Sequence, residues 1–219
     1  MKKPRICGVI TNNDLKAIKE AEPFVDLFEV RIDLIGDGWQ ELVRQIDKPW
    51  IACNRIAEEG GKWQGTEARR TEQLLQATEL GAAIIDIELR TKNLENIVKL
   101  IKRKSSCLLS FHDFEKTPPL DELKEIVQRQ LEAGAIICKV VTTARRAEDN
   151  ITALQLISEF ISVRLVSFAM GAIGIMSRVL CPLVGGEFTY ASIEKGVESA
   201  TGQLTTTELR SLYGMMRED

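Results

Sequence analysis

A lysine inside an apolar segment is the residue of this sequence that most needs a chemical explanation. Lys139 lies in the run AIICKVV at residues 135–141, which has the composition of a strand buried on both faces of a parallel sheet. An unpaired ammonium there would cost several kcal/mol. Lys139 therefore either extends to the strand end or pairs with a buried carboxylate, or it is a desolvated amine with a lowered pKa that attacks a carbonyl and forms a Schiff base.

His112 is the only histidine in the chain and ends the strand-like run before the one that holds Lys139. Neighbouring strands of a sheet lie about 5 Å apart, so inward-facing His112 and Lys139 can reach the same substrate carbon. Imidazole suits the proton transfers that imine chemistry needs near neutral pH. An isolated histidine is more often structural, and that alternative stays open at this point.

Charged residues also end other strand-like runs. Glu29 and Arg31 share one face of the run 27–31, Arg55 follows the run 50–54, and Asp86 and Glu88 share one face of the run 84–88. Any one pair is most simply explained as a salt bridge. Together they predict a polar site at the carboxyl ends of the strands, in which Asp86 and Glu88 either support the lysine or form ion pairs at the mouth.

Residues after the seventh and eighth strand-like runs offer contacts to an anion. The planar guanidinium of Arg178 suits a carboxylate, and Ser199 and Gln203 can add hydrogen bonds. Their loop, with Gly196 and Gly202 as hinges, is either a lid or an ordinary exposed loop. Glycines at positions 171, 174, 185 and 186 keep a phosphorylated substrate open as an alternative.

Composition excludes several function classes. The formal net charge of −3 over 219 residues, with the two signs interspersed, disfavours nucleic acid or an anionic membrane as a partner and favours a small molecule. The sequence has no Cys/His cluster for zinc, no Walker loop and no G-x-G-x-x-G motif, so neither a metal nor a cofactor is expected. No signal peptide or membrane span is visible, and the five cysteines include no C-x-x-C, which predicts a cytoplasmic protein with reduced, unpaired thiols.

Strand-like and helical patterns alternate along the whole sequence. The predicted strands are residues 6–10, 27–31, 50–54, 84–88, 107–111, 136–141, 165–169 and 188–190. The predicted helices are residues 14–21, 66–80, 93–104, 121–133, 147–161 and 205–216. This alternation indicates a parallel sheet, and eight such units predict a single-domain α/β protein, a (β/α)8 TIM barrel over residues 1–219, with an open doubly wound sheet as the alternative.

The order of these motifs resembles the type I 3-dehydroquinate dehydratase family. The resemblance covers nearly the whole chain and rests on six motifs in register. They are Glu29-x-Arg31-x-Asp33, Arg55-x-x-x-Glu59-Gly-Gly, Ser110-x-His112-Asp-Phe, Lys139 in its apolar strand, Gly174-Ile-Met-Ser-Arg178 and Ser199-Ala-Thr-Gly-Gln203.

The resemblance implies a (β/α)8 barrel that dehydrates 3-dehydroquinate to 3-dehydroshikimate in the shikimate pathway of aromatic amino acid biosynthesis. It implies a lysine imine, no metal or cofactor, and a homodimer. By position, Lys139 is the expected Schiff-base lysine, His112 the general acid and base, and Glu59 the residue that holds the imidazole. The expected substrate contacts are Glu29, Arg31 and Arg55 for ring hydroxyls, Arg178, Ser199 and Gln203 for the carboxylate, and Phe168, Met170 and Tyr190 for the apolar walls.

One departure from longer family members concerns the amino terminus. They carry an N-terminal hairpin that covers the barrel floor, whereas this sequence reaches its first strand just after Arg5, so a minimal barrel with a floor of core side chains is expected. Two other functions are weighed: an aldolase-like or transaldolase-like lysine-imine enzyme acting on a sugar phosphate, and a barrel that only binds a polyhydroxy acid. Trapping an imine on Lys139 with borohydride would separate the dehydratase from the binding protein.

Overall fold

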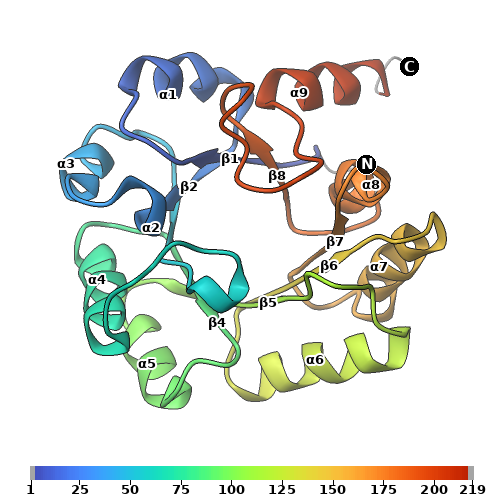
Figure 1. Ribbon diagram of the computed structural model, residues 1–219, viewed down its shortest axis with the longest axis horizontal. Helices are drawn as coiled ribbons and strands as arrows, with labels where there is room; N and C mark the ends of the chain where they lie inside the picture. Colours follow the sequence, from blue (N-terminus) through green and yellow to red (C-terminus); the bar gives the residue numbers. More distant parts are fainter. Residues whose placement is uncertain (1–2, 217–219) are drawn as a thin grey trace.

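The computed structural model describes residues 3–216, in which eight strands alternate with helices (Figure 1). The strands are β1 (Ile6–Ile10), β2 (Leu27–Arg31), β3 (Trp50–Cys53), β4 (Ile84–Glu88), β5 (Ser106–His112), β6 (Ile137–Thr143), β7 (Leu165–Met170) and β8 (Thr189–Ser192). The helices are α1 (Leu15–Ala21), α2 (Ile32–Ile35), α3 (Trp39–Val43), α4 (Glu67–Glu79), α5 (Leu94–Ile101), α6 (Leu120–Glu132), α7 (Glu148–Glu159), α8 (Ile175–Leu180) and α9 (Thr206–Met215). Short 3₁₀ turns are η1 (Glu22–Phe24), η2 (Ala57–Glu59) and η3 (Cys181–Leu183).

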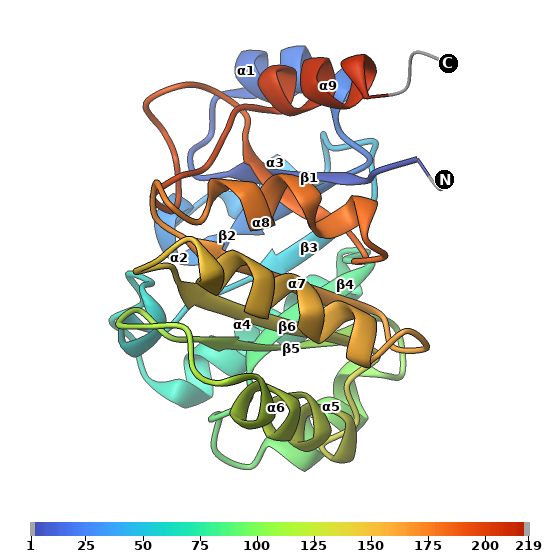
Figure 2. The same cartoon turned by 90° about the vertical axis from the view of Figure 1, so that its right-hand side faces the viewer.

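The strands form one parallel sheet in the order β7-β6-β5-β4-β3-β2-β1-β8, curled into a nearly closed barrel. The longer helices surround it, as the two perpendicular views show (Figures 1 and 2). The predicted (β/α)8 barrel is therefore confirmed, and the open doubly wound alternative is wrong. The carboxyl ends of all eight strands meet at one end of this barrel, where loops can build a site.

The seam between β7 and β8 is looser than the rest of the barrel. Within residues 3–216 the two strands share no ladder, and the backbone N–H of Glu187 donates across the seam to the carbonyl oxygen of Leu165 at 2.8 Å. The rings of Phe168 and Tyr190 meet edge to face with centroids 6.2 Å apart. Aromatic packing thus bridges a place where backbone pairing stops.

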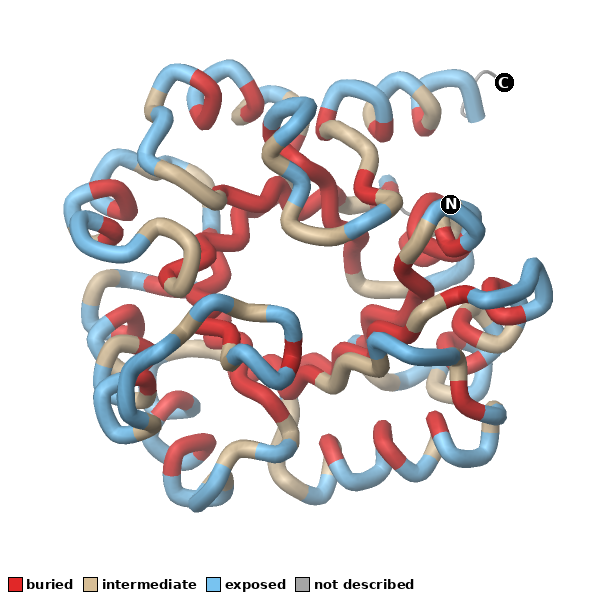
Figure 3. Tube along the Cα trace, in the orientation of Figure 1, coloured by how far each residue is buried: buried red, intermediate tan, exposed pale blue. Residues whose placement is uncertain are grey.

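The barrel interior is apolar at the amino ends of the strands and polar toward their carboxyl ends. Five fully buried apolar side chains belong to the lower layers: Cys7, Leu27, Ile51, Leu108 and Ile137. These side chains form the predicted floor, and the strands make an almost continuous buried ring (Figure 3). The register pairs Glu88 with Ser110 and Ser110 with Lys139, so a polar layer spans three neighbouring strands.

Helix α9 ties the end of the chain to its beginning. Thr205 and Glu208 form a capping box at its start. The guanidinium of Arg210 donates to the carbonyl oxygen of Phe24 and, at 2.9 Å, to the carboxylate of Asp26. The α9 helix lies beside α1 in both ribbon views (Figures 1 and 2), which fixes the far end of the loop that carries Ser199 and Gln203.

Three short helices were not predicted. The α2 helix follows β2 without a break and is rich in isoleucine and leucine, so it resembles a continuation of the strand. The α3 helix has five residues and α8 six, too few to show a helical period. The five cysteines all lie within the described residues and are unpaired, as predicted. No helix between residues 3 and 216 is long and apolar enough to cross a bilayer.

Candidate active site

One cavity opens at the carboxyl ends of the strands, with a volume of about 520 Å³ that includes its open mouth. The twelve predicted site residues all line it: Glu29, Arg31, Arg55, Glu59, His112, Lys139, Phe168, Met170, Arg178, Tyr190, Ser199 and Gln203. Residues separated by up to 174 positions in the sequence are thus brought to one place, from Glu29 to Gln203.

Lys139 is buried in this cavity and held by carboxylates. Its Nζ lies 2.9 Å from Oδ2 of Asp86 and 3.5 Å from Oε2 of Glu29, and 4.3 Å from the centre of the Tyr190 ring. Burial alone would lower the pKa of Lys139, but the charges of Asp86 and Glu29 outweigh it and raise the pKa above its ordinary value. Of the two alternatives for Lys139, the structure shows pairing with buried carboxylates, so Lys139 is an ion-paired ammonium whose pKa is raised rather than lowered.

His112 is held by Glu59. Its Nδ1 lies 2.8 Å from Oε2 of Glu59, which reaches the barrel mouth from the turn η2. Gly60 ends this turn with φ of 77°, a conformation that favours glycine, and the Phe114 ring fills the space beside it. Burial, together with the charges of Arg55 and Lys139, lowers the pKa of His112 well below its usual value, so the imidazole is neutral near pH 7.

A chain of buried charges lies behind Lys139. Arg55 contacts Asp86 at 2.7 Å and Glu88 at 2.9 Å, and Arg70 from α4 contacts the other oxygen of Glu88 at 2.6 Å. Ser110 donates to Asp86 and accepts from Arg55. Burial would raise the pKa of Asp86, but Arg55 and Lys139 together hold it far below its ordinary value. Asp86 is therefore a direct partner of the lysine, while Glu88 bridges two arginines, which settles the question left open for these two carboxylates.

Arg31 has its own carboxylate partner. Its guanidinium donates two hydrogen bonds to Asp33, at 2.9 and 2.7 Å. Asp33 also accepts from the backbone N–H groups of Arg55 and Lys62. Asp33 belongs to the first sequence motif but was not among the predicted site residues, and its role is to orient Arg31 and to join the loops after β2 and β3.

Among the buried cations of residues 3–216, Arg178 is the one without a carboxylate partner. It is 2% exposed, and its Nε and Nη2 atoms have no hydrogen-bond partner within residues 3–216. Its Cζ lies 4.3 Å from the centre of the Phe168 ring. Burial lowers the pKa of Arg178 to about 10, so it remains charged at neutral pH. A buried, uncompensated guanidinium facing a cavity calls for an anionic ligand.

The loop between β8 and α9 is held by hydrogen bonds within itself and to Gly171, which follows β7. The backbone N–H of Ser199 donates to Oε1 of Gln203 at 2.9 Å, and the N–H of Gly171 donates to the carbonyl oxygen of Thr201 at 3.2 Å. A Cβ on Gly202 would lie 2.4 Å from the carbonyl oxygen of Gly171, so only glycine allows this close approach.

Three of the four glycines that kept a phosphate cradle open have their backbone N–H groups bound within the protein. The N–H of Gly171 binds Thr201, that of Gly174 binds the carbonyl of Gly171, and that of Gly186 binds the carbonyl of Cys181. A phosphate site of this kind needs several free backbone N–H groups. These three glycines instead shape turns, which favours a carboxylate over a phosphate as the ligand of this end of the cavity.

Glu29, Cys53 and Asp86 place three potential metal ligands within 4.8 Å of one another. Lys139 and Arg55 already contact the two carboxylates, and burial raises the pKa of the Cys53 thiol well above its usual value. Ion pairing with these cations accounts for the cluster, because the fixed positive charges stand where a metal would be.

Four further residues line the cavity and were not predicted: Gly60, Phe114, Val141 and Ala200. Phe114 stacks on His112 with ring centres 6.0 Å apart. Val141 follows Lys139 by two positions on one strand, so strand periodicity could have placed it on the same face. Gly60, Phe114 and Ala200 lie within the motifs already recognised, adjacent to predicted residues or two positions from one.

The barrel and its lysine-centred cavity define a (β/α)8-barrel enzyme. A family profile described as Type I 3-dehydroquinase matches residues 6–219. A 3-dehydroquinate dehydratase of Dehalococcoides mccartyi is 41% identical over 214 residues, covering 97% of this chain and 96% of that protein. One of Methanocaldococcus jannaschii is 34% identical over 215 residues, covering 95% and 96%.

Among solved structures, the type I 3-dehydroquinate dehydratase of Clostridium difficile superposes with a TM-score of 0.87 at 24% identity, covering 99% of this chain and 93% of that one. At this identity the structural similarity shows the fold alone. The family profile and the sequence relatives also show the family. The chain belongs to the type I 3-dehydroquinase family, whose members are hydro-lyases.

Proposed function

We propose that this enzyme dehydrates 3-dehydroquinate to 3-dehydroshikimate through a Schiff base on Lys139, as a step of the shikimate pathway. The observation that carries the proposal is that Lys139 and the uncompensated Arg178 line one cavity. A cyclic keto acid presents a carbonyl for the amine and a carboxylate for the guanidinium. The names of the sequence relatives, 3-dehydroquinate dehydratase, support the choice of substrate.

The substrate is held at both ends. Its carboxylate binds Arg178, with Ser199 and Gln203 adding hydrogen bonds from the β8–α9 loop. Glu29 and Arg31 face the ring hydroxyls, while Phe168, Met170 and Tyr190 form apolar walls. Arg55 lines the same cavity, but its terminal nitrogens are bound to Asp86 and Glu88, so its main contribution is charge. Binding at both ends orients the ring for reaction.

The imine converts a weak electron sink into a strong one. After losing a proton, the Lys139 amine attacks the ketone, and loss of water from the carbinolamine leaves an iminium. Asp86 and Glu29, which hold the ammonium in the free protein, then hold the positive iminium. The neighbouring methylene becomes acidic, and the electrons released there later expel the hydroxyl beside the carboxylate. Hydrolysis of the conjugated imine frees the product and Lys139.

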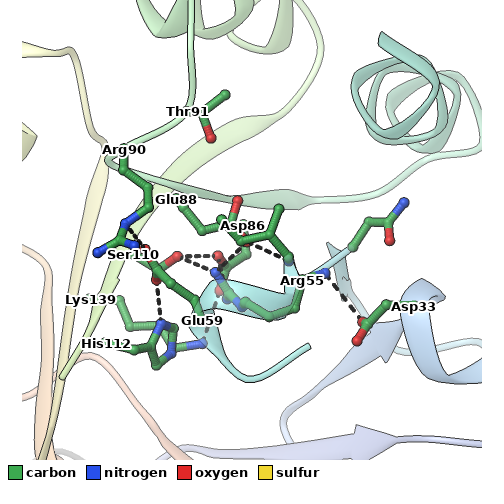
Figure 4. A network of polar contacts seen from close by, with 12 residues as sticks. Asp33, Arg55, Glu59, Asp86, Glu88, Arg90, Thr91, Ser110, His112 and Lys139 are labelled. Atoms are coloured by element: carbon green, nitrogen blue, oxygen red, sulfur yellow. Dashed lines mark hydrogen bonds and ion pairs between the residues drawn. The ribbon is translucent and has the colours of Figure 1, made fainter. Parts of the chain in front are cut away.

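His112 moves the protons, and Glu59 sets its tautomer (Figure 4). With Glu59 ionised, Nδ1–H of His112 donates to Glu59 and Nε2 is free to take the methylene proton. The protonated imidazole then gives that proton to the departing hydroxyl, which leaves as water. A neutral resting His112, with its lowered pKa, is in the state that the first of these transfers needs.

The defining test adds sodium borohydride to the protein with 3-dehydroquinate. We expect product formation without borohydride, and with it an irreversible mass increase that matches the reduced ligand and maps to Lys139. Lys99, an exposed lysine on α5, serves as the internal control and should stay unmodified. Turnover without a trapped adduct would contradict the imine mechanism. Faster cleavage of a phosphorylated aldol substrate than of 3-dehydroquinate would favour an aldolase instead.

Replacing Arg178 with methionine should separate binding from folding. Two charge-assisted hydrogen bonds to the substrate contribute about 3 kcal/mol, so Arg178→Met is expected to raise KM about 100-fold. The same change removes a buried charge without a partner, so the melting temperature of the free protein should stay level or rise. Steady-state kinetics and thermal unfolding measure both, with exposed Arg103→Met as the matched control. An unchanged KM would contradict the carboxylate assignment.

Three further expectations belong to this proposal. The chain is taken as one catalytic domain located in the cytoplasm. It is also expected to form a homodimer, for which three exposed apolar side chains offer a contact surface: Ile151 on α7, Ile173 just before α8, and Met176 on α8. Hydrogen bonds from Asn150 to the carbonyl of Ile173 and from the Ser177 N–H to Asn150 hold the two helices together, so these side chains belong to one face.

A further inference from the structure

Arg90 contacts the carboxylate that holds the catalytic histidine. Its Nε lies 3.1 Å from Oε1 of Glu59, while Oε2 of the same carboxylate lies 2.8 Å from Nδ1 of His112. Figure 4 shows the Glu59 carboxylate between the two side chains. Arg90 itself does not line the cavity, so it reaches Glu59 from outside the substrate site.

The backbone around Arg90 is fixed although its side chain is half exposed. The N–H of Leu89 donates to the carbonyl of Ser110, and the N–H of Thr91 donates to the carbonyl of Glu88. Arg70 donates to the hydroxyl of Thr91 at 3.0 Å. These bonds on both sides of Arg90 fix the start of its side chain, so less conformational entropy is lost when it pairs with Glu59.

Burial and charges of both signs act on the ionisation of Glu59, and Arg90 is one of the two cations that favour its charged form. Burial raises the pKa of Glu59 to about 7, the charges of Arg55 and Arg90 oppose that shift, and Glu88 and Asp86 add to it. His112 is the remaining titratable contact. Glu59 has 1% of its side chain exposed, against 53% for Arg90, so Arg90 connects a buried carboxylate to the solvent.

We propose that Arg90 is a positioning residue that keeps Glu59 ionised and oriented, so that Glu59 holds the imidazole of His112 in the tautomer with Nε2 free. The inference deepens the proposed function and rests on it for its kinetic consequences. A protonated Glu59 would donate to Nδ1 and leave a hydrogen on Nε2, where the first proton transfer needs a lone pair. Arg90 therefore determines the lowest pH at which the histidine can act as a base.

The test compares Arg90→Gln, Arg90→Lys and, as a matched control, Lys92→Gln. Lys92 is an exposed cation of the same loop and forms no ion pair within the described residues. Two quantities are measured over pH 5 to 9, namely kcat/KM for 3-dehydroquinate and the imidazole ¹⁵N chemical shifts after histidine labelling. His112 is the only histidine in the chain, so the nitrogen signals need no assignment.

For Arg90→Gln we expect the acid limb of kcat/KM and the midpoint of the histidine signals to move upward by about half a unit to one unit. The rate near pH 7 should fall several-fold and recover at higher pH. Arg90→Lys should restore most of the shift, and Lys92→Gln should match the unmodified protein. A pH-independent loss of rate with an unmoved NMR midpoint, or an equal shift in Lys92→Gln, would overturn the proposal.

The two readouts keep this inference separate from the proposed function. If 3-dehydroquinate is not turned over, the NMR midpoint still reports whether Arg90 controls the Glu59 and His112 pair. If turnover is observed and the midpoint does not move in Arg90→Gln, the dehydratase assignment stands and the role of Arg90 fails.

Discussion

Replacing Lys139 with alanine is expected to lower kcat/KM for 3-dehydroquinate by about 10⁵-fold, the scale on which covalent nucleophiles contribute. Without the amine, the substrate keeps its ketone, and the methylene beside it is far less acidic than beside an iminium. The borohydride adduct should disappear as well. Residual activity would then reflect binding and the proton transfers of His112 alone.

The Lys139→Ala variant needs a folding control, because it leaves Asp86 and Glu29 without their cation. Removing one partner of a buried pair typically costs about 3–5 kcal/mol of stability. Lys139→Met fills more of the volume that the lysine side chain occupied, so it is the better variant for this control. Circular dichroism and thermal unfolding should show folded Lys139→Met protein that lacks both adduct and turnover. A folded variant with near-normal turnover would refute the Schiff base.

The raised pKa of Lys139 also sets the sign of a pH effect. A lysine with a pKa above its ordinary value is almost wholly ammonium at pH 7, and its neutral fraction grows tenfold for each pH unit up to the pKa. Where amine attack limits trapping, the trapping rate should therefore rise with pH. In the proposed mechanism Asp86 and Glu29 would therefore slow this first step and stabilise the iminium that follows.

The position of the candidate site could be predicted from the sequence, but the interactions among its charged side chains could not. The cost of a charge in an apolar strand identified Lys139, and strand alternation placed Glu29, Arg31 and His112 on inward faces. The sequence left the direction of the Lys139 pKa shift open, because it depends on Asp86, which lies 53 positions away and approaches only through the barrel register. Burial is visible in a pattern, but the distance between two side chains on different strands is not.

Two arginines outside the strands also have contacts that the sequence did not predict. Arg70 lies on a helix whose pattern gives no reason to bury a cation, yet it is fully buried against Glu88. Arg90 looks like an ordinary loop cation in the sequence, and only the path of the chain after β4 brings it to Glu59. The short helices α2, α3 and α8 were not predicted because each spans too few residues to show a helical period.

Replacing His112 with alanine is expected to reduce kcat by about 10³-fold while leaving imine formation partly intact. In the proposed mechanism the imidazole carries the proton from the methylene to the departing hydroxyl, so its loss should stop the reaction after the iminium has formed. Borohydride should then trap a substrate-sized adduct on Lys139 in a protein that hardly turns over. Because burial lowers the pKa of His112, the imidazole of the unmodified enzyme should be neutral near pH 7, and its own protonation should limit the rate only at lower pH.

A Glu59→Gln variant tests how far the negative charge of Glu59 supports His112. Glutamine can still accept from Nδ1–H but lacks the charge that stabilises the protonated imidazole, so kcat should fall by less than in His112→Ala, about 10- to 100-fold. Added imidazole should partly restore turnover in His112→Ala, where the lost ring leaves space, and not in Glu59→Gln. Near-normal kcat in His112→Ala would remove the histidine from the mechanism and leave proton transfer to the carboxylates around Lys139.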